Sequence, residues 1–287
     1  MRPIVLTAVL VLAPASISAQ QRIERRIAVD AAASIRIFNL NGTTRVTGWD
    51  RDSIAVTGSV PPAAGRFFMG GTGPAAKVGV FSDSAAPAGA DLDIHVPRGA
   101  TVWIKSFTAN VEVSGVVGDI DISSVTGSIR VDGAPRRVTA EAMDGTIDLT
   151  TRAVYTRAKT ASGAITIRGG GGDITASTVS GIIRYLGAHK VITGRLESVT
   201  GPVTFEGTVM RGGTLEVETH DGAIDLTVPP DQLADFDVTT FAGSVTNALN
   251  RESPVVPKGK PVRFSAGSGG ARITVRTFKG NVRVGPG

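Results

Sequence analysis

A short phrase recurs along the chain and constrains its fold more than any other feature. In each copy a small polar residue precedes a glycine, and apolar residues follow at the second and fourth positions after it. The clearest copies are marked by Gly127, Gly145, Gly163, Gly181, Gly201 and Gly222. Their spacing is nearly constant for three intervals and then lengthens slightly. A period of about 20 residues with short strands is typical of stacked coils.

Aligning the copies on their glycines predicts columns of equivalent side chains, because like residues of neighbouring coils lie about 4.7–4.9 Å apart in a parallel stack. Small, mostly hydroxyl-bearing residues stand three positions before the glycines: Ser124, Ala142, Thr160, Thr178, Ser198, Thr219 and Thr240. Apolar residues stand two positions after: Ile129, Ile147, Ile165, Ile183, Val203, Ile224 and Val245. Further residues stand four positions after: Val131, Leu149, Ile167, Tyr185, Phe205, Leu226 and Asn247.

These columns predict an all-β fold: a single-stranded parallel β-solenoid, similar to a β-helix, with coils of about 18–21 residues. Right-handed coils are expected because parallel crossovers are right-handed. Glycine is expected to supply the bend of each coil. Asn110, about one coil before Gly127, is expected to take the glycine position of the first coil because asparagine tolerates positive φ.

Residues 1–19 are typical of a signal peptide. Arg2 supplies a positive charge, residues 4–13 form an apolar run, and cleavage is expected after Ala19. The chain lacks cysteine, so it has neither disulfides nor a cysteine for a lipid anchor. No later stretch is long enough for a membrane helix. We therefore expect an exported protein that is periplasmic, secreted or on the cell surface.

The rest of the chain, 20–287, is interpreted as a single β-solenoid domain. Its predicted parts are a capping region over 30–100 with an irregular loop over 61–90, regular coils over 101–248, a proline-rich insertion over 249–261 and closing coils over 262–287. Within the loop one strand is expected over Ala76–Phe81, and the apolar Phe67, Phe68 and Met69 are expected to plug the open end of the stack. One helical turn is expected over Asp231–Asp237.

Candidate acid–base pairs are poor. Asp148 and Asp225 occupy equivalent outward positions but lie four coils apart, about 19 Å at the strand spacing. Glycosidases need carboxylates within about 5–9.5 Å of each other. Asp144 and Asp221 are separated in the same way and are interpreted as turn residues.

Two carboxylate pairs lie within single predicted strands. Asp119 and Asp121 form one pair, and Asp91 and Asp93 form the other. The latter two share a face with His95, so a metal or acid–base site there is one hypothesis, although outward-facing strand residues explain the pattern better.

Other motifs are incomplete. The histidines, His95, His189 and His220, show no metal-ligand spacing, and His220 and Asp221 are expected on opposite faces of a strand. The glycine-rich Gly169–Asp173 differs from a calcium-binding repeat. Gly259-Lys260-Pro261 lacks the residues of a phosphate-binding loop. Asn41-Gly42-Thr43 matches a glycosylation acceptor, but Asn41-Gly42 is explained by a turn. We therefore assign no catalytic, cofactor-binding or metal-binding residue and expect no cofactor.

The chain resembles the bacterial putative-adhesin family, an exported β-solenoid domain of unknown function. The matching signs are Ile37–Asp50, Leu92–Val113, the SG and DG coils, and Phe264–Val284. The resemblance implies a fold and a location outside the cytoplasm. It brings no catalytic residues, and the segment 61–87 departs from the family pattern.

The leading hypothesis is a non-catalytic, adhesin-like protein that binds an envelope component, a protein or a glycan through its surface. The net charge of +5 is scattered, so we expect no nucleic-acid partner. The alternative is a polysaccharide lyase or hydrolase with a groove along one face. Acidic and basic side chains from three adjacent coils would favour it, although Trp49, Trp103, Tyr155 and Tyr185 are few and scattered. A purely architectural spacer is a third possibility.

Overall fold

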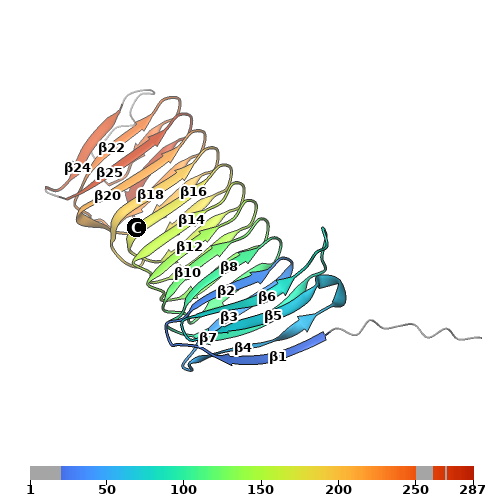
Figure 1. Ribbon diagram of the computed structural model, residues 1–287. Coiled ribbons are helices and arrows are strands. Elements are labelled where there is room, and N and C mark those ends of the chain that lie inside the picture. The colour runs from blue at the N-terminus through green and yellow to red at the C-terminus, as the bar shows by residue number, and fades with distance from the viewer. Residues whose placement is uncertain (1–20, 250–260, 269) are drawn as a thin grey trace, which may run out of the picture.

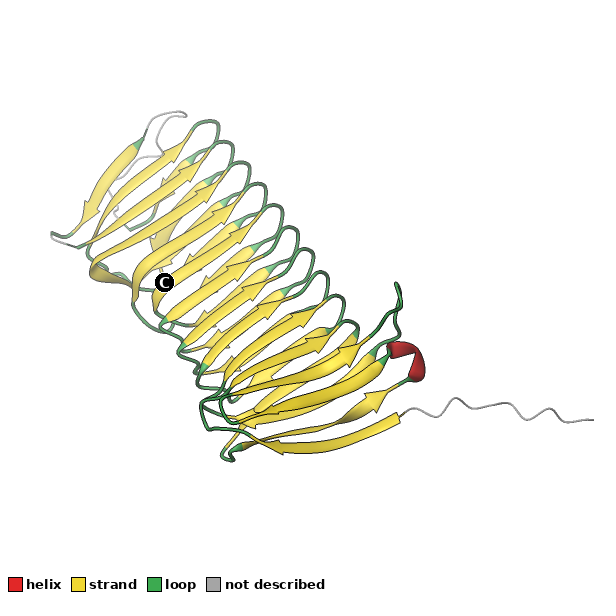
Figure 2. Ribbon diagram, in the orientation of Figure 1, coloured by secondary structure: helices red, strands yellow, loops and turns green. Residues whose placement is uncertain are grey.

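The computed structural model describes residues 21–249, 261–268 and 270–287, and this part of the chain is built from strands. Figures 1 and 2 show an elongated stack in which two long sheets face each other. Each sheet has 13 strands, most of them paired in parallel, and the described residues contain no α-helix, only the short 3₁₀ turn η1 (Pro62–Ala64). The predicted all-β, mainly parallel fold class is confirmed. The predicted signal peptide, most of the proline-rich insertion, and Gly259 and Lys260 within it lie outside the described residues.

The first sheet, sheet A, contains the strands that follow the repeated glycines. Its order is β1 (Gln21–Ala28), β4 (Ser53–Val60), β7 (Ala90–Pro97), β3 (Gly42–Trp49), β9 (Asn110–Ser114), β11 (Ile129–Gly133), β13 (Ile147–Thr151), β15 (Ile165–Gly169), β17 (Ile183–Leu186), β19 (Val203–Glu206), β21 (Ile224–Val228), β26 (Val282–Pro286) and β23 (Val245–Asn247).

The second sheet, sheet B, contains the strands that precede the glycines. Its order is β24 (Val262–Ala266), β22 (Ala234–Thr240), β25 (Ala271–Thr277), β20 (Val209–Thr219), β18 (Val191–Ser198), β16 (Gly172–Thr178), β14 (Tyr155–Lys159), β12 (Arg137–Glu141), β10 (Asp119–Ser123), β8 (Thr101–Ser106), β2 (Ser34–Asn39), β6 (Ala75–Phe81) and β5 (Arg66–Thr72).

Along the middle of the chain, successive strands alternate between the sheets, so one coil places one strand in each. The predicted columns form as expected: Ile129 pairs with Ile147, Ile147 with Ile165, and Ile165 with Ile183. These side chains are buried and pack into one core with the inward-facing residues of sheet B. Each apolar side chain therefore lies on the equivalent side chain of the neighbouring coil, and the β-branched residues suit a parallel sheet buried on its inner face.

The repeated glycines have a different role from the expected one. None of those that follow the hydroxyl column has a positive φ. Instead, a Cβ at Gly181 would overlap the carbonyl oxygen of Gly163, and the same overlap recurs from coil to coil. Glycine is required because adjacent turns approach too closely for a side chain. Asn110 does not take this position: Ala109 does, while the Asn110 side chain accepts hydrogen bonds from Ser128.

The hydroxyl column fastens these turns. The N–H of Gly181 donates to Thr178 Oγ1 at 3.0 Å, and that hydroxyl donates to Ala161 O at 3.2 Å. Thr160, Ser198, Thr219, Thr240 and Thr277 cap the glycine that follows them in the same way. Each such hydroxyl is buried, so its hydrogen bonds satisfy groups that would otherwise be costly to bury.

The order of the last coils in space differs from their order in the chain. The coil of β25 and β26 lies between the coil of β20 and β21 and the coil of β22 and β23. Gly280 therefore lies on Gly222, and Gly243 lies on Gly280. The predicted columns place Thr240 directly after Thr219 and Val245 after Ile224, and this order does not hold in space, because a glycine period reports equivalent positions and not their spatial neighbours.

The N-terminal end is more regular than expected. Instead of an irregular loop over 61–90 with one strand, β5 and β6 form an antiparallel hairpin. Phe67 and Met69 face inward and pack against the core, whereas Phe68 faces outward and contacts Phe38, with ring centroids 6.3 Å apart. The helical turn expected over Asp231–Asp237 is absent, and its second half belongs to β22.

We predict that Gly181→Ala lowers the free energy of unfolding by at least about 2 kcal/mol, because the new methyl group must displace the backbone of the neighbouring coil. Gly70→Ala is the matched control: no heavy atom lies within 4 Å of the position its Cβ would take, so stability should change by less than about 0.5 kcal/mol. Urea unfolding followed by circular dichroism measures both. Equal stabilities of the two variants would contradict the close-approach explanation.

Candidate binding surface

One line of side chains follows the turns that lead from sheet B to sheet A. We call it the turn ridge and define it as the residues two positions before the close-packed turn residue of each coil: Phe107, Val125, Met143, Ala161, Val179, Val199, His220, Phe278 and Phe241. Their backbones form a ladder, in which Val199 N–H donates to Val179 O at 3.1 Å and His220 N–H to Val199 O at 3.0 Å. The ladder holds the backbone, and the side chains lie outside the core.

The turn ridge is apolar over most of its length and ends in an aromatic stack. Phe107, Met143, Val179 and Val199 are exposed. At the C-terminal end, the His220 and Phe278 rings stack at 5.0 Å, and the Phe278 and Phe241 rings stack at 5.0 Å with 2° between their planes. Phe241 remains 63% exposed. Because Phe278 stacks on both of its neighbours, mainly the edge of its ring is presented to a partner.

A groove of about 780 Å³ lies beside this end of the ridge, on the outer face of sheet B. Its lining comes from six neighbouring strands, β14, β16, β18, β20, β25 and β22. Along the groove the outward column carries Lys159, Ser177, Glu197, Glu218, Arg276 and Thr239. An apolar border and a charged floor are thus placed side by side.

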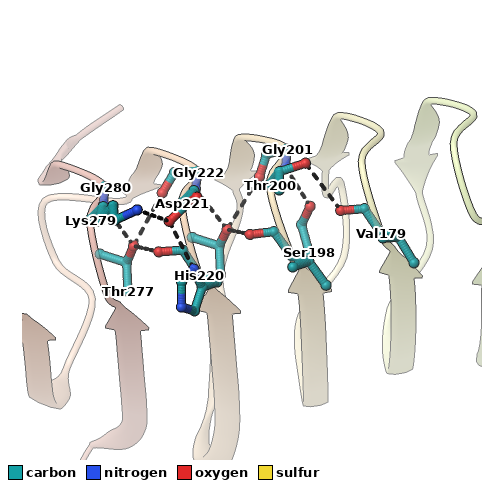
Figure 3. A network of polar contacts seen from close by, with 12 residues as sticks. Val179, Ser198, Thr200, Gly201, His220, Asp221, Gly222, Thr277, Lys279 and Gly280 are labelled. Atoms are coloured by element: carbon teal, nitrogen blue, oxygen red, sulfur yellow. Dashed lines mark hydrogen bonds and ion pairs between the residues drawn. The ribbon is translucent and has the colours of Figure 1, made fainter.

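Figure 3 shows the polar contacts that hold the turns under this end of the ridge. Thr277 Oγ1 donates to His220 O at 3.4 Å and to Gly222 O at 3.3 Å. His220 Nδ1 lies 2.8 Å from Asp221 Oδ1, and Lys279 Nζ lies 3.7 Å from the same oxygen. The expectation that His220 and Asp221 point apart was wrong, because β20 ends at Thr219 and both residues belong to the turn.

Glu197 and Glu218 are a carboxylate pair that sequence reasoning did not reveal. They are direct partners in the pairing of β18 with β20, so they lie on adjacent coils, and Arg276 follows on the next. Glu197 accepts a hydrogen bond from Arg195 Nε at 2.6 Å. The pair was hidden because the coil between the two glutamates is longer than the early coils and the glycines within β18 and β20 do not recur at equivalent positions from coil to coil. The hydroxyl column one position later could have revealed it.

The acidic candidates from the sequence each have an ordinary structural environment. Asp93 pairs with Arg45 at 3.6 Å, and His95 packs on Trp49 with ring centroids 5.1 Å apart. Asp91 is exposed on the same strand and borders a groove that His95 does not line. Among the described residues, no group of three His, Cys, Asp or Glu side chains is placed to hold a metal ion.

The remaining carboxylates lie as expected, outward and apart. Asp148 pairs with Arg130 of the neighbouring coil at 3.8 Å, and Asp225 pairs with Arg283 at 3.9 Å. Asp144 accepts a hydrogen bond from Ser162 Oγ at 2.7 Å. Such exposed pairs contribute up to about 1 kcal/mol each to the stability of the protein, so the fold depends little on them.

The four large aromatic residues named from the sequence occupy three kinds of environment. Tyr185 is fully buried, and burial raises its pKa to about 12. Trp49 lies under the guanidinium groups of Arg26 and Arg51, and Tyr155 under that of Arg137. Trp103 is 45% exposed on the outer face of sheet B.

Neighbouring carboxylates on β10 are shifted in opposite directions. The Arg136 side chain donates two hydrogen bonds to Asp119, both at 2.8 Å, and lowers the pKa of that carboxyl below its usual range. Partial burial, followed by the charge of Glu141, raises the pKa of Asp121. One strand therefore carries two groups whose ionisation affects folding with opposite sign.

We predict that Asp121→Asn is more stable than the unchanged protein at pH 7, by less than about 1 kcal/mol because the site is partly exposed. A raised native pKa disfavours the charged form, so the gain is complete above that pKa and disappears as the pH falls below the unfolded value near 3.9. Asp119→Asn is the opposite control: stability is lost at pH 7, and the difference vanishes at low pH. Urea unfolding at pH 3 to 7 tests both, and parallel pH profiles would contradict the assignment.

None of the helical structure described in this chain is long and apolar enough to cross a membrane. No family model matches the sequence, and no curated protein matches it. Among solved structures, the chain is similar to one described as a putative cell adhesion protein from Clostridium sporogenes ATCC 15579, with 7% identity, a TM-score of 0.24, and coverage of 93% of this chain and 100% of that one. A likeness of this extent does not establish a shared family.

Proposed function

We propose that this chain is a non-catalytic, exported, adhesin-like protein, built as a right-handed parallel β-solenoid, that binds a protein partner of the cell envelope along the turn ridge. The observation that carries the proposal is the exposed apolar line that ends in the stack of His220, Phe278 and Phe241. Export is supported by the pattern of residues 1–19.

The fold does not require apolar side chains on the turn ridge. The backbone ladder and the hydroxyl column hold the turns whatever side chain points outward. Exposed aromatic side chains in line, beside a charged groove, are typical of protein interfaces, where aromatic anchors lie next to a polar rim. A rigid backbone also lowers the entropy cost of binding.

The stacking of the rings favours a protein over a glycan at this site. Sugar rings pack on open aromatic faces, and the faces of Phe278 lie against His220 on one side and Phe241 on the other. Ring edges and aliphatic side chains such as Val179 and Val199 suit an apolar stripe on a partner protein.

One observation favours the polysaccharide-active alternative. Glu197 and Glu218 stand on adjacent coils in the groove, a separation close to the roughly 5–5.5 Å of retaining glycosidases. Glu197, however, is held by Arg195, and both carboxylates belong to a column of mixed charged and hydroxyl side chains like those elsewhere on the sheets. The pair is explained by the surface pattern, so we rank this function second.

We expect the double variant Phe241→Ser/Phe278→Ser to capture about tenfold less of its envelope partner than the unchanged protein, because it removes the exposed aromatic anchors. The measurement immobilises residues 20–287 and quantifies each bound protein from solubilised envelopes. Ile192→Ser/Met210→Ser is the matched control, since both residues are exposed apolar side chains away from the ridge. Equal capture by the two double variants would refute the proposed surface.

A turnover assay on neutral and acidic polysaccharides separates the two functions. We expect no depolymerisation by the unchanged protein beyond that of Glu197→Gln/Glu218→Gln. Turnover that this double variant abolishes, while thermal stability is kept, would make the enzyme the correct interpretation. Turnover lost on substituting Asp91, Asp93 or His95 would instead restore the sequence-based candidate site.

A further inference from the structure

A second surface, at the other end of sheet B, gathers cations and aromatic rings. Along one outward column Gly70 pairs with Lys77, Lys77 with Arg36, and Arg36 with Trp103. Along the neighbouring outward column lie Phe68, Gly79, Phe38 and Lys105. We call these residues of β5, β6, β2 and β8 the N-terminal patch; these strands lie together at the N-terminal end of the stack in Figure 1.

The patch is hollowed. A groove of about 570 Å³ is lined by Arg36, Lys77, Phe68 and Met69, together with small residues of β5 and β6. Gly70 keeps its floor open, because no heavy atom lies within 4 Å of the position that a Cβ would take there. Beside the groove, a Cβ at Gly79 would overlap the carbonyl oxygen of Phe38, so β6 and β2 approach too closely for a side chain at that position. The concave form suits a chain-like ligand lying along the columns better than a flat membrane surface.

The central cations of the patch form no ion pair among the described residues, in contrast to several outward-facing arginines of other strands. Arg45, Arg130, Arg157 and Arg195 all form ion pairs with carboxylates of their own or a neighbouring strand. Arg36 and Lys77 are exposed, and within the described part of the chain neither forms an ion pair.

Few carboxylates face the patch. Asp121 follows Trp103 in the column, and Lys105 already lowers the pKa of that carboxyl, against the larger effect of burial. Asp30 lies beyond the β5–β6 turn, beside Gly73. The patch is therefore positive overall, with unpaired donors at its centre.

Trp103 supplies an open ring next to these cations. It is 45% exposed, and no other ring or cation of the described residues stacks on it. This differs from Phe278 of the turn ridge, whose ring stacks on both His220 and Phe241.

We propose that the N-terminal patch binds an acidic polysaccharide. Carboxylate or sulfate groups of the glycan accept hydrogen bonds from Arg36 and Lys77, and one sugar ring packs on Trp103. Guanidinium groups match the geometry of such anions. The columns advance about 4.7–4.9 Å per strand, close to the advance of an extended pyranose chain per sugar, so successive sugars meet successive strands. This site is separate from the turn ridge and goes beyond the function proposed above.

The test measures binding of residues 20–287 to polygalacturonate and dextran sulfate, with unmodified dextran as the neutral glycan, by affinity electrophoresis. We expect the acidic glycans alone to bind, more weakly at high salt because the charges are screened. Arg36→Gln/Lys77→Gln and Trp103→Ala should each weaken binding about tenfold or more. Arg184→Gln/Lys190→Gln removes the same charges elsewhere and should leave binding unchanged.

Three results would overturn the proposal. The first is an equal loss of binding in Arg36→Gln/Lys77→Gln and in the charge-matched control, which would indicate attraction by net charge alone. The second is binding of anionic phospholipid vesicles or a short DNA duplex as tight as that of the acidic glycans. The third is absence of binding to either acidic glycan. The Phe241→Ser/Phe278→Ser variant should bind acidic glycans normally, so failure at one site is distinguishable from failure at the other.

Discussion

The close approach of neighbouring turns determines the rest of the structure. Each column glycine lies under the carbonyl oxygen of the preceding coil, and the hydroxyl three residues earlier closes the turn by capping the glycine N–H. Two independent contacts therefore specify the same alignment of one coil on the next. A shift of one residue would move every inward side chain outward, so this alignment also decides which residues form the core and which are free for binding.

The same alignment separates what the fold requires from what it permits. On the outer faces, opposite charges in adjacent strands pair across coils, as Arg130 does with Asp148, and such columns are simple ways to keep a stack soluble. On the turn ridge, the backbone groups bond along the stack and leave the side chain unconstrained. Apolar residues there cost solubility and stabilise the fold little. Their presence at position after position therefore supports the proposal that this surface contacts a partner.

The sequence predicts sheet A well because glycine marks the start of its regular strands, and the column from Ile129 to Ile183 follows from counting. It predicts sheet B poorly, because the longer later coils hide which residues pair, and Glu197 and Glu218 pass unnoticed. The hairpin of β5 and β6 was missed because glycine and proline indicate loops in general, whereas here Gly79 lies within a strand and allows close approach to the backbone of Phe38. A sequence repeat does not predict how side chains point within a turn, so the contact of His220 with the neighbouring aspartate was not foreseen.

The position of β25 and β26 in the two sheets determines which side chains meet at the proposed binding surface. Phe278 lies between His220 and Phe241 only because β25 lies between β20 and β22, and Arg276 joins the groove for the same reason. A chain stacked in its sequence order would place Phe241 directly after His220 and would lack both residues at this site. The aromatic stack therefore depends on β25 and β26, which follow β22 and β23 in the chain but lie between them and β20 and β21, so the proposed binding surface is complete only when these strands are in place.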